Sequence, residues 1–174
     1  MKSYVGRLPA WEAERGIRHT MDLYAHAMDY GEEEIWCDCF TDDALFLVND
    51  AQKNFDEIYR VQGAKALAAY IAAYPSPPVI FAKHICSQIL IQVDGDTASS
   101  ESFWLAINSS GGEEGGQPNI MAFGRYKDRL VCCPDGRWRF SERICETEAA
   151  NWPEPGTYTD RENFSGASTT TELA

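Results

Sequence analysis

Three side chains of this sequence, Tyr24, Asp29 and His84, could together carry out acid–base chemistry. An imidazole can take up a proton near neutral pH and give it back, and a carboxylate within hydrogen-bond reach fixes its tautomer and stabilises the imidazolium. A phenol can donate a hydrogen bond to a substrate oxygen on which negative charge develops. Chemistry of this kind needs no metal and no bound cofactor, so we expect a cofactor-independent site.

A helix predicted over residues 11–30 carries the tyrosine and the aspartate. Its apolar residues recur at helical spacing: Ile17, Met21, Tyr24 and Met28. Tyr24 is in the centre of this stripe, whereas Asp29 lies about 140° around a straight helix from it. A straight helix would therefore direct Asp29 toward solvent, and we expect it to turn inward only if the helix ends near Met28. Gly31 is a typical helix stop.

His84 opens the first of four predicted strands, which run over residues 79–93, 96–108, 119–132 and 137–147. Asp94-Gly95 and Asp135-Gly136 are hairpin signals between them. The preceding chain predicts a short acidic helix over 32–40, a strand over 44–48, a polar irregular segment over 49–62 and an alanine-rich helix over 64–73. This order is typical of an α+β fold in which three helices close one face of a curved, mostly antiparallel sheet. Such a sheet forms a cone, whose mouth is a natural ligand pocket.

Length and charge bound the class of protein. The chain has 174 residues, which suits one domain, and we expect it over residues 1–149 with a tail over 150–174. The net charge of −12, from 27 acidic and 15 basic residues, disfavours nucleic acid and anionic membranes as partners. No apolar run approaches the roughly 20 residues of a membrane span, and the start shows no signal-peptide pattern. We therefore expect a cytoplasmic protein.

The six cysteines, in that compartment, are expected to be reduced thiols. Cys37-x-Cys39 and Cys132-Cys133 lack the two-residue gap of common zinc sites, and the three histidines show no metal spacing. We predict no metal, and the cysteines are then small buried apolar side chains.

Several segments together resemble the SnoaL-like family of the nuclear transport factor 2-like (NTF2-like), ketosteroid isomerase-like superfamily. Residues 24–31 and 36–44 resemble the opening of these proteins. Further segments follow in the family's order: the helix after Gly63, Lys83-His84, and residues 93–98, 124–128 and 135–140. The resemblance covers about residues 10–147 and implies a cystatin-like α+β barrel shaped as a cone.

The resemblance also implies an activity. Members similar to scytalone dehydratase and bile-acid dehydratase pair a helix Tyr and Asp with a strand His, at places that match Tyr24, Asp29 and His84. This implies a cofactor-independent lyase that eliminates water, or a small carbonyl fragment, from a small hydroxylated cyclic or aromatic molecule. Scytalone dehydratase has a second pocket histidine on the next strand, whereas residues 97–108 contain none. An isomerase, an epoxide hydrolase and a non-catalytic binding or partner-stabilising module remain alternatives.

Four aromatic residues and one arginine are candidates for lining a substrate pocket: Phe46, Trp104, Phe123, Tyr126 and Arg143. The aromatic residues serve equally well as core. Arg143 alternates with inward Trp138, Phe140 and Glu142 on the last strand, where it would bind a substrate anion or, as we favour, form a buried salt bridge. The outer face of the sheet is apolar, and family members commonly pair through it, which implies a homodimer or small homo-oligomer.

Overall fold

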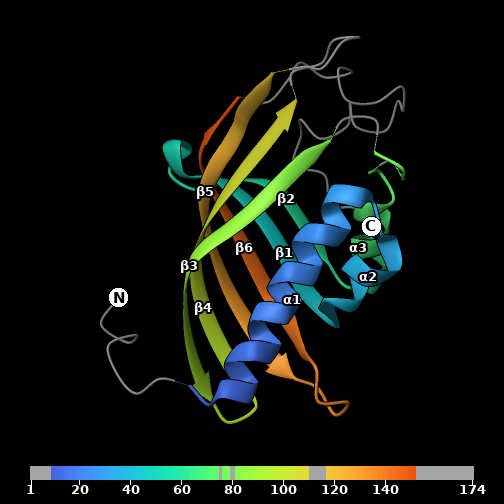
Figure 1. The fold of residues 1–174 in the computed structure, drawn as a ribbon, viewed down its shortest axis with the longest axis vertical. Helices are drawn as coiled ribbons and strands as arrows, with labels where there is room; N and C mark the ends of the chain where they lie inside the picture. Colours follow the sequence, from blue (N-terminus) through green and yellow to red (C-terminus); the bar gives the residue numbers. More distant parts are fainter. Residues whose placement is uncertain (1–8, 75, 79–80, 110–116, 152–174) are drawn as a thin grey trace.

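The computed structural model describes residues 9–74, 76–78, 81–109 and 117–151. In these residues three α-helices lie on the same face of one curved sheet (Figure 1): α1 (Trp11–Tyr30), α2 (Glu33–Asp38) and α3 (Ala64–Ile71). The sheet has six strands: β1 (Phe40–Asp50), β2 (Asp56–Gln62), β3 (Ala82–Asp94), β4 (Thr97–Ser109), β5 (Pro118–Cys132) and β6 (Trp138–Ala150). A short 3-10 helix, η2 (Ala51–Lys53), joins β1 to β2.

The strands are ordered β2-β1-β6-β5-β4-β3, and β1 runs parallel to β6 while all other neighbours are antiparallel. The α+β class and the mostly antiparallel sheet are confirmed. Strand β2 was not predicted, because the polar and charged residues of this segment are also typical of a loop. It is an edge strand on which only Val61 is fully buried. The predicted tail lies outside the described residues beyond its first two positions.

Helix α1 sets the geometry of the interior. Its apolar stripe packs against the inner face of the sheet, where it meets β3 and β6. A Cβ atom at Gly16 would lie 2.7 Å from Cδ1 of Trp138, so glycine allows a close approach to β6. At the other end Gly31 adopts the left-handed conformation, with φ of 65°, and its N–H reaches back to the carbonyls of Ala27 and Met28. No helix in the described part of the chain is long and apolar enough to span a bilayer.

The outer face of the sheet carries a patch of apolar side chains. Ile85, Leu105 and Phe123 stand side by side in register on β3, β4 and β5. Phe103 and Ile120, which are 52% and 58% exposed, extend this outer apolar patch. Phe123 was expected to line the substrate pocket, and that prediction is wrong. Strand alternation turns Ala122 and Tyr126 inward and therefore turns Phe123 to the outer face, where it is 44% exposed.

We expect the protein to associate through the outer apolar patch as a homodimer or small homo-oligomer, because apolar patches of this kind mark interaction surfaces. Phe123→Glu would place a charge in the contact and should yield a monomer in light scattering at micromolar concentration. Ile35→Glu is the matched control, since Ile35 is also 44% exposed but lies on α2. A monomeric wild-type protein would contradict the expectation.

Candidate active site

A direct contact joins the end of α1 to the start of β3. Oδ1 of Asp29 lies 2.6 Å from Nδ1 of His84, and both carboxylate oxygens lie 3.1 Å from the backbone nitrogen of His84. The Asp29 side chain is only 5% exposed, whereas that of His84 is 17% exposed. A proton on Nδ1 shared with Asp29 leaves Nε2 as the nitrogen that can meet a substrate. The sequence therefore paired these two residues correctly.

We expected Asp29 to turn inward only if the helix ended near Met28, and this expectation was wrong. Helix α1 does not end near Met28 but continues through Tyr30, and Asp29 is nevertheless buried. The reason is that β3 lies against this side of the last helical turn, so the direction that would lead to solvent leads to the backbone of His84. Asp22, which lies almost in line with Asp29 along the helix, is exposed.

Tyr24 lies in a closely packed aromatic cluster on the inner side of α1. Its ring centroid is 5.7 Å from that of Trp36, 6.4 Å from Phe46 and 6.2 Å from Tyr126. Burial raises the pKa of Tyr24 well above its ordinary value, and the nearby charge of Arg143 opposes this. The phenol is consequently neutral at physiological pH, as a hydrogen-bond donor to an oxyanion must be.

Arg143 forms the buried salt bridge that we favoured. Its Nε atom is 3.6 Å from Oδ1 of Asp128, both side chains are almost fully buried, and its Cζ atom is 4.0 Å from the Tyr24 ring centroid. Burial raises the pKa of Asp128 to about 6, while Arg143 and a hydrogen bond from Ser100 act in the opposite direction.

A β-bulge explains why Arg143 points inward. Leu130 pairs with Phe140 and Arg129 pairs with Glu142, so one extra residue interrupts the alternation of β6. Phe140 and Arg143 consequently share the inner face. Glu142, which strict alternation had placed inward, lies outside and contacts Arg129 at 3.2 Å.

The remaining lining candidates, Phe46, Trp104 and Tyr126, are on the inner face and 2–4% exposed. Trp104 stacks on Tyr126 with ring centroids 5.7 Å apart, and its indole nitrogen has no hydrogen-bond partner in the described chain. They pack as core in this structure, and their contact with a substrate stays a prediction.

The sequence analysis did not single out Tyr74, which follows α3. Its hydroxyl oxygen is 3.1 Å from that of Tyr70, one helical turn earlier. Burial raises the pKa of Tyr74 to about 12, and the negative charge of Asp29 is among the causes that act in the same direction. The available signal was the spacing of two tyrosines by four residues, one near the end of a predicted helix and the other just before a proline-rich segment.

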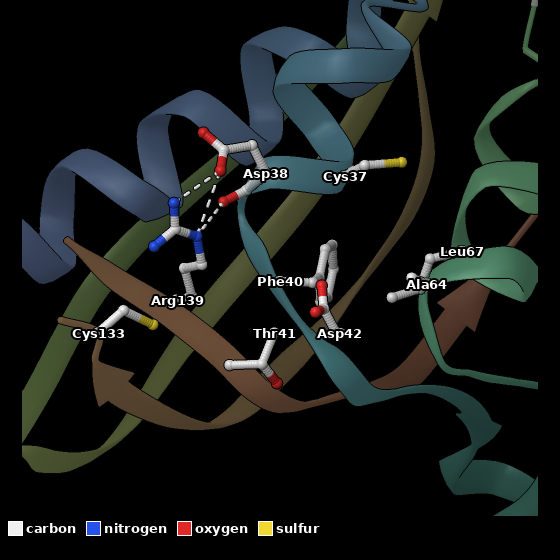
Figure 2. A pocket seen from close by; sticks show the side chains of 9 residues that line it. All are labelled: Cys37, Asp38, Phe40, Thr41, Asp42, Ala64, Leu67, Cys133 and Arg139. Carbon is white, nitrogen blue, oxygen red and sulfur yellow. Dashed lines mark hydrogen bonds and ion pairs between the residues drawn. The ribbon is translucent and has the colours of Figure 1, made fainter. Parts of the chain in front are cut away.

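A surface hollow of about 540 Å³ lies among α2, the start of β1, α3 and the turn before β6. Figure 2 shows the side chains that line it. None of its lining residues belongs to the Tyr24, Asp29 and His84 group. Its carboxylate Asp38 hydrogen-bonds to Arg139; although burial raises the pKa of Asp38, the bonds from Arg139 and Arg137 lower it overall. A paired carboxylate of this kind is a poor base. The other carboxylate of this hollow, Asp42, is exposed, and no histidine is among its lining residues. The chemistry therefore favours the Asp29–His84 contact over the hollow.

Another hollow, of about 660 Å³, lies along the first half of α1, between Trp11 and Asp22, and also lacks the acid–base group. In the part of the chain that the structure describes, no three His, Cys, Asp or Glu side chains gather as a metal site. The absence of a metal or other cofactor remains a prediction.

A family model described as a SnoaL-like domain matches residues 9–144. Comparison with curated proteins gives no match.

Solved structures from Novosphingobium aromaticivorans share the fold. The β subunit of a candidate aromatic-ring-hydroxylating dioxygenase is 22% identical with a TM-score of 0.67, over 79% of this chain and 90% of that one. A candidate scytalone dehydratase is 24% identical with a TM-score of 0.59, over 82% and 93%. An NTF2-like protein with a cystatin-like fold is 18% identical with a TM-score of 0.59, over 76% and 80%. At these identities the likeness shows the fold alone, which is the fold that the sequence predicted.

Arg143→Met would leave Asp128 as an unpaired buried carboxylate. Breaking a buried pair in this way costs about 3–5 kcal/mol, so the free energy of unfolding at neutral pH should fall by that order. Loss of the cation raises the pKa of Asp128 further above its unfolded value. The folded protein then binds the proton more tightly, and the deficit should grow as the pH rises and shrink as it falls.

Urea unfolding near pH 5 and near pH 8 measures both effects, because these pH values lie on either side of the pKa of about 6 to which burial raises Asp128. Arg129→Met is the matched control, because it breaks the neighbouring pair with Glu142 on the outer face, where Arg129 is 74% exposed. Exposed pairs contribute only about 0–1 kcal/mol. A deficit equal to that of the control, or independent of pH, would contradict the role of Arg143.

Proposed function

Because the chain belongs to the SnoaL-like domain family, whose fold includes dehydratases, we propose that it is a cofactor-independent lyase that works by acid–base catalysis. The observation that carries this proposal is the 2.6 Å contact between Asp29 and His84. A carboxylate that is nearly enclosed and an imidazole that is partly exposed are what a proton-transfer site requires, since the first orients and the second reaches the substrate. We infer that His84 is the general base and that Asp29 orients it.

The proposed reaction is the loss of water from a carbonyl compound with a hydroxyl group at the β carbon. Nε2 of His84 takes a proton from the carbon beside the carbonyl, and the electrons of that C–H bond pass into an enolate. Tyr24 donates a hydrogen bond to the enolate oxygen. The enolate then collapses to a carbon–carbon double bond, the C–O bond at the β carbon breaks, and the imidazolium returns its proton to the departing oxygen as water.

The inner face supports a small cyclic or aromatic substrate with hydroxyl groups. Aromatic side chains at Phe46, Trp104 and Tyr126 offer ring surfaces. The indole N–H of Trp104 offers a donor that has no acceptor among the residues the structure describes. The same groups would serve a retro-aldol cleavage, in which His84 takes the hydroxyl proton and a carbon–carbon bond breaks to release a small carbonyl fragment. Isomerisation or epoxide hydrolysis on this fold would also use them.

A second candidate is a non-catalytic module that binds a ligand or stabilises a partner. The similarity to a protein described as the β subunit of a ring-hydroxylating dioxygenase favours it. The two candidates differ in one measurable property: the lyase exchanges an acidic substrate proton with solvent deuterium, and the binding module does not.

We expect His84→Ala to lower turnover by about 10²–10⁴-fold, the usual contribution of a general base, while the fold is kept. Asp29→Asn should lose nearly as much, because a neutral amide cannot stabilise the imidazolium. The double variant should be little worse than either single one, since residues that act as a unit fail together.

The assay is a double-mutant cycle on a panel of cyclic β-hydroxyketones that begins with 3-hydroxy-1-tetralone, which becomes 1-naphthol when it loses water. His26→Ala, an exposed histidine on α1, is the matched control. Additive effects, or near-normal turnover in His84→Ala, would mean that His84 is structural.

Tyr24→Phe should lower turnover less than either His84→Ala or Asp29→Asn does. It removes one hydrogen bond to a developing charge, worth about 1.5–3 kcal/mol, and keeps the aromatic ring in its packed place. The loss should fall on kcat more than on KM, because the charge exists only in the transition state. A loss confined to KM would instead indicate that Tyr24 only binds the substrate.

A further inference from the structure

A row of three polar side chains, Ser100, Asp128 and Arg143, crosses the inner face of the sheet. Asp128 on β5 pairs in register with Ser100 on β4 and with Arg143 on β6. All three residues are only 1–3% exposed. The acid–base mechanism gives no part to this polar row. Ionised groups that are enclosed so completely are costly unless their hydrogen-bonding positions are filled.

The two charged groups of the polar row are close together but are not hydrogen-bonded to each other. Ser100 donates to Oδ2 of Asp128 at 3.1 Å. The other oxygen, Oδ1, lies 3.6 Å from Nε of Arg143, which is too long for a hydrogen bond. Among the residues that the structure describes, Oδ1 of Asp128 and both Nε and Nη1 of Arg143 have no hydrogen-bond partner. One acceptor and two donors therefore remain to be matched.

Aromatic rings pack on the guanidinium of Arg143 without meeting this need. Its Cζ atom lies 3.8 Å from the ring centroid of Tyr126, 4.0 Å from that of Tyr24 and 4.3 Å from that of Phe140. Cation–π contacts of this kind act on the charge, whereas the N–H groups lie in the plane of the guanidinium and still require acceptors. The contact with Tyr24 also places the polar row beside the phenol that we propose to bind the enolate oxygen.

The polar row lies at a different level of the sheet from the imidazole. His84 pairs with Ala106 on β4, and Ser100 is six residues away from Ala106 along that strand. Six residues of a strand span about 20 Å. A group bound by Arg143 and Asp128 is therefore remote from the carbon that gives its proton to His84.

We propose that Arg143 and Asp128 bind one oxygen atom that both accepts and donates hydrogen bonds: a water molecule in the free protein and a hydroxyl group of the substrate in the complex. An oxygen can lie about 2.9 Å from both Nε and Oδ1, because these atoms are only 3.6 Å apart. It accepts from Arg143 and donates to Asp128. Three polar partners are also the usual number for a buried water.

This donor and acceptor pattern defines the class of ligand group. A hydroxyl group reproduces the hydrogen bonds of the water, whereas an ether or carboxylate oxygen cannot donate to Asp128 and an ammonium group cannot accept from Arg143. The inference rests on the proposed function for the place of the ligand, and it deepens that function. The substrate is an elongated molecule with a second hydroxyl group that does not react.

The first test compares three naphthalene probes by their binding to the wild-type protein, so it needs no turnover. The probe 2,6-dihydroxynaphthalene carries the second hydroxyl group, 2-naphthol lacks it, and 6-methoxy-2-naphthol carries an oxygen that cannot donate. The methoxy group displaces the water without replacing its bonds, and this loses affinity. We expect 2,6-dihydroxynaphthalene to bind at least as tightly as 2-naphthol and about 10- to 100-fold more tightly than 6-methoxy-2-naphthol, the value of a hydrogen bond to a charged group.

A double variant, Arg143→Met with Asp128→Val, tests whether the polar row causes this preference. Replacement of a whole buried ion pair by apolar residues is often neutral or stabilising, so the fold should be kept. The preference for 2,6-dihydroxynaphthalene over the methoxy probe should then disappear. Arg129→Met with Glu142→Val is the matched control, because it removes the ion pair on the outer face and should keep the preference. Equal preferences in the two double variants, or no binding of 2,6-dihydroxynaphthalene to the wild type at millimolar concentration, would overturn the inference.

Crystal structures of the wild-type protein, free and with 2,6-dihydroxynaphthalene, give a readout that does not depend on any variant. We expect an oxygen within hydrogen-bond distance of Nε of Arg143 and Oδ1 of Asp128 in both crystals, from water in the first and from the ligand in the second. A buried water only, which stays in place in the complex, or a direct hydrogen bond between the two side chains would overturn the inference even if His84→Ala abolishes turnover. A ligand hydroxyl group at this position together with normal turnover in His84→Ala would support it and overturn the proposed catalytic role.

Discussion

The interior of this protein depends on the hydrogen bonds between the carboxylate of Asp29 and His84. Enclosing an ionised group is costly unless hydrogen bonds replace its water, and here the ring and the backbone N–H of His84 both do so. The contact therefore fastens α1 to β3, the edge strand farthest from β2. It also sets the direction of the imidazole. The two carboxylate oxygens of Asp29 therefore both hold α1 against β3 and orient the ring of His84.

The position of Asp29 is fixed from both ends of α1. Gly16 lets the first half of the helix approach Trp138 on β6, and Gly31 ends the helix immediately after Asp29 has met β3. Between these points Tyr24 is held over Arg143, whose charge is balanced by Asp128. The guanidinium opposes the effect of burial on the Tyr24 phenol. The helix thus presents its tyrosine and its aspartate on different sides, one to the inner face of the sheet and the other to its edge strand.

The sequence was informative where structure follows from local spacing. The apolar stripe of α1, Gly31 and the Asp-Gly turns predicted the helix and the hairpins because each depends on a few neighbouring residues. It failed where a contact between distant segments decides the outcome. Asp29 is buried because β3 passes beside it, and Glu142 lies outside because a bulge shifts the alternation of β6. Strand β2 was missed because polar residues on an edge strand resemble a loop.

The two hollows described above lie apart from the Asp29–His84 contact. The hollow between α2, α3 and the turn before β6 has the space, but its Arg139 is paired with Asp38 and no histidine is among its lining residues. The Asp29–His84 contact has an imidazole whose second nitrogen is not engaged by the carboxylate, beside side chains that pack as core in this structure. An enclosed aromatic interior excludes water, which strengthens the effect of each fixed dipole and charge on a bound substrate. A ligand must then displace or separate aromatic side chains to reach Tyr24, which is only 2% exposed.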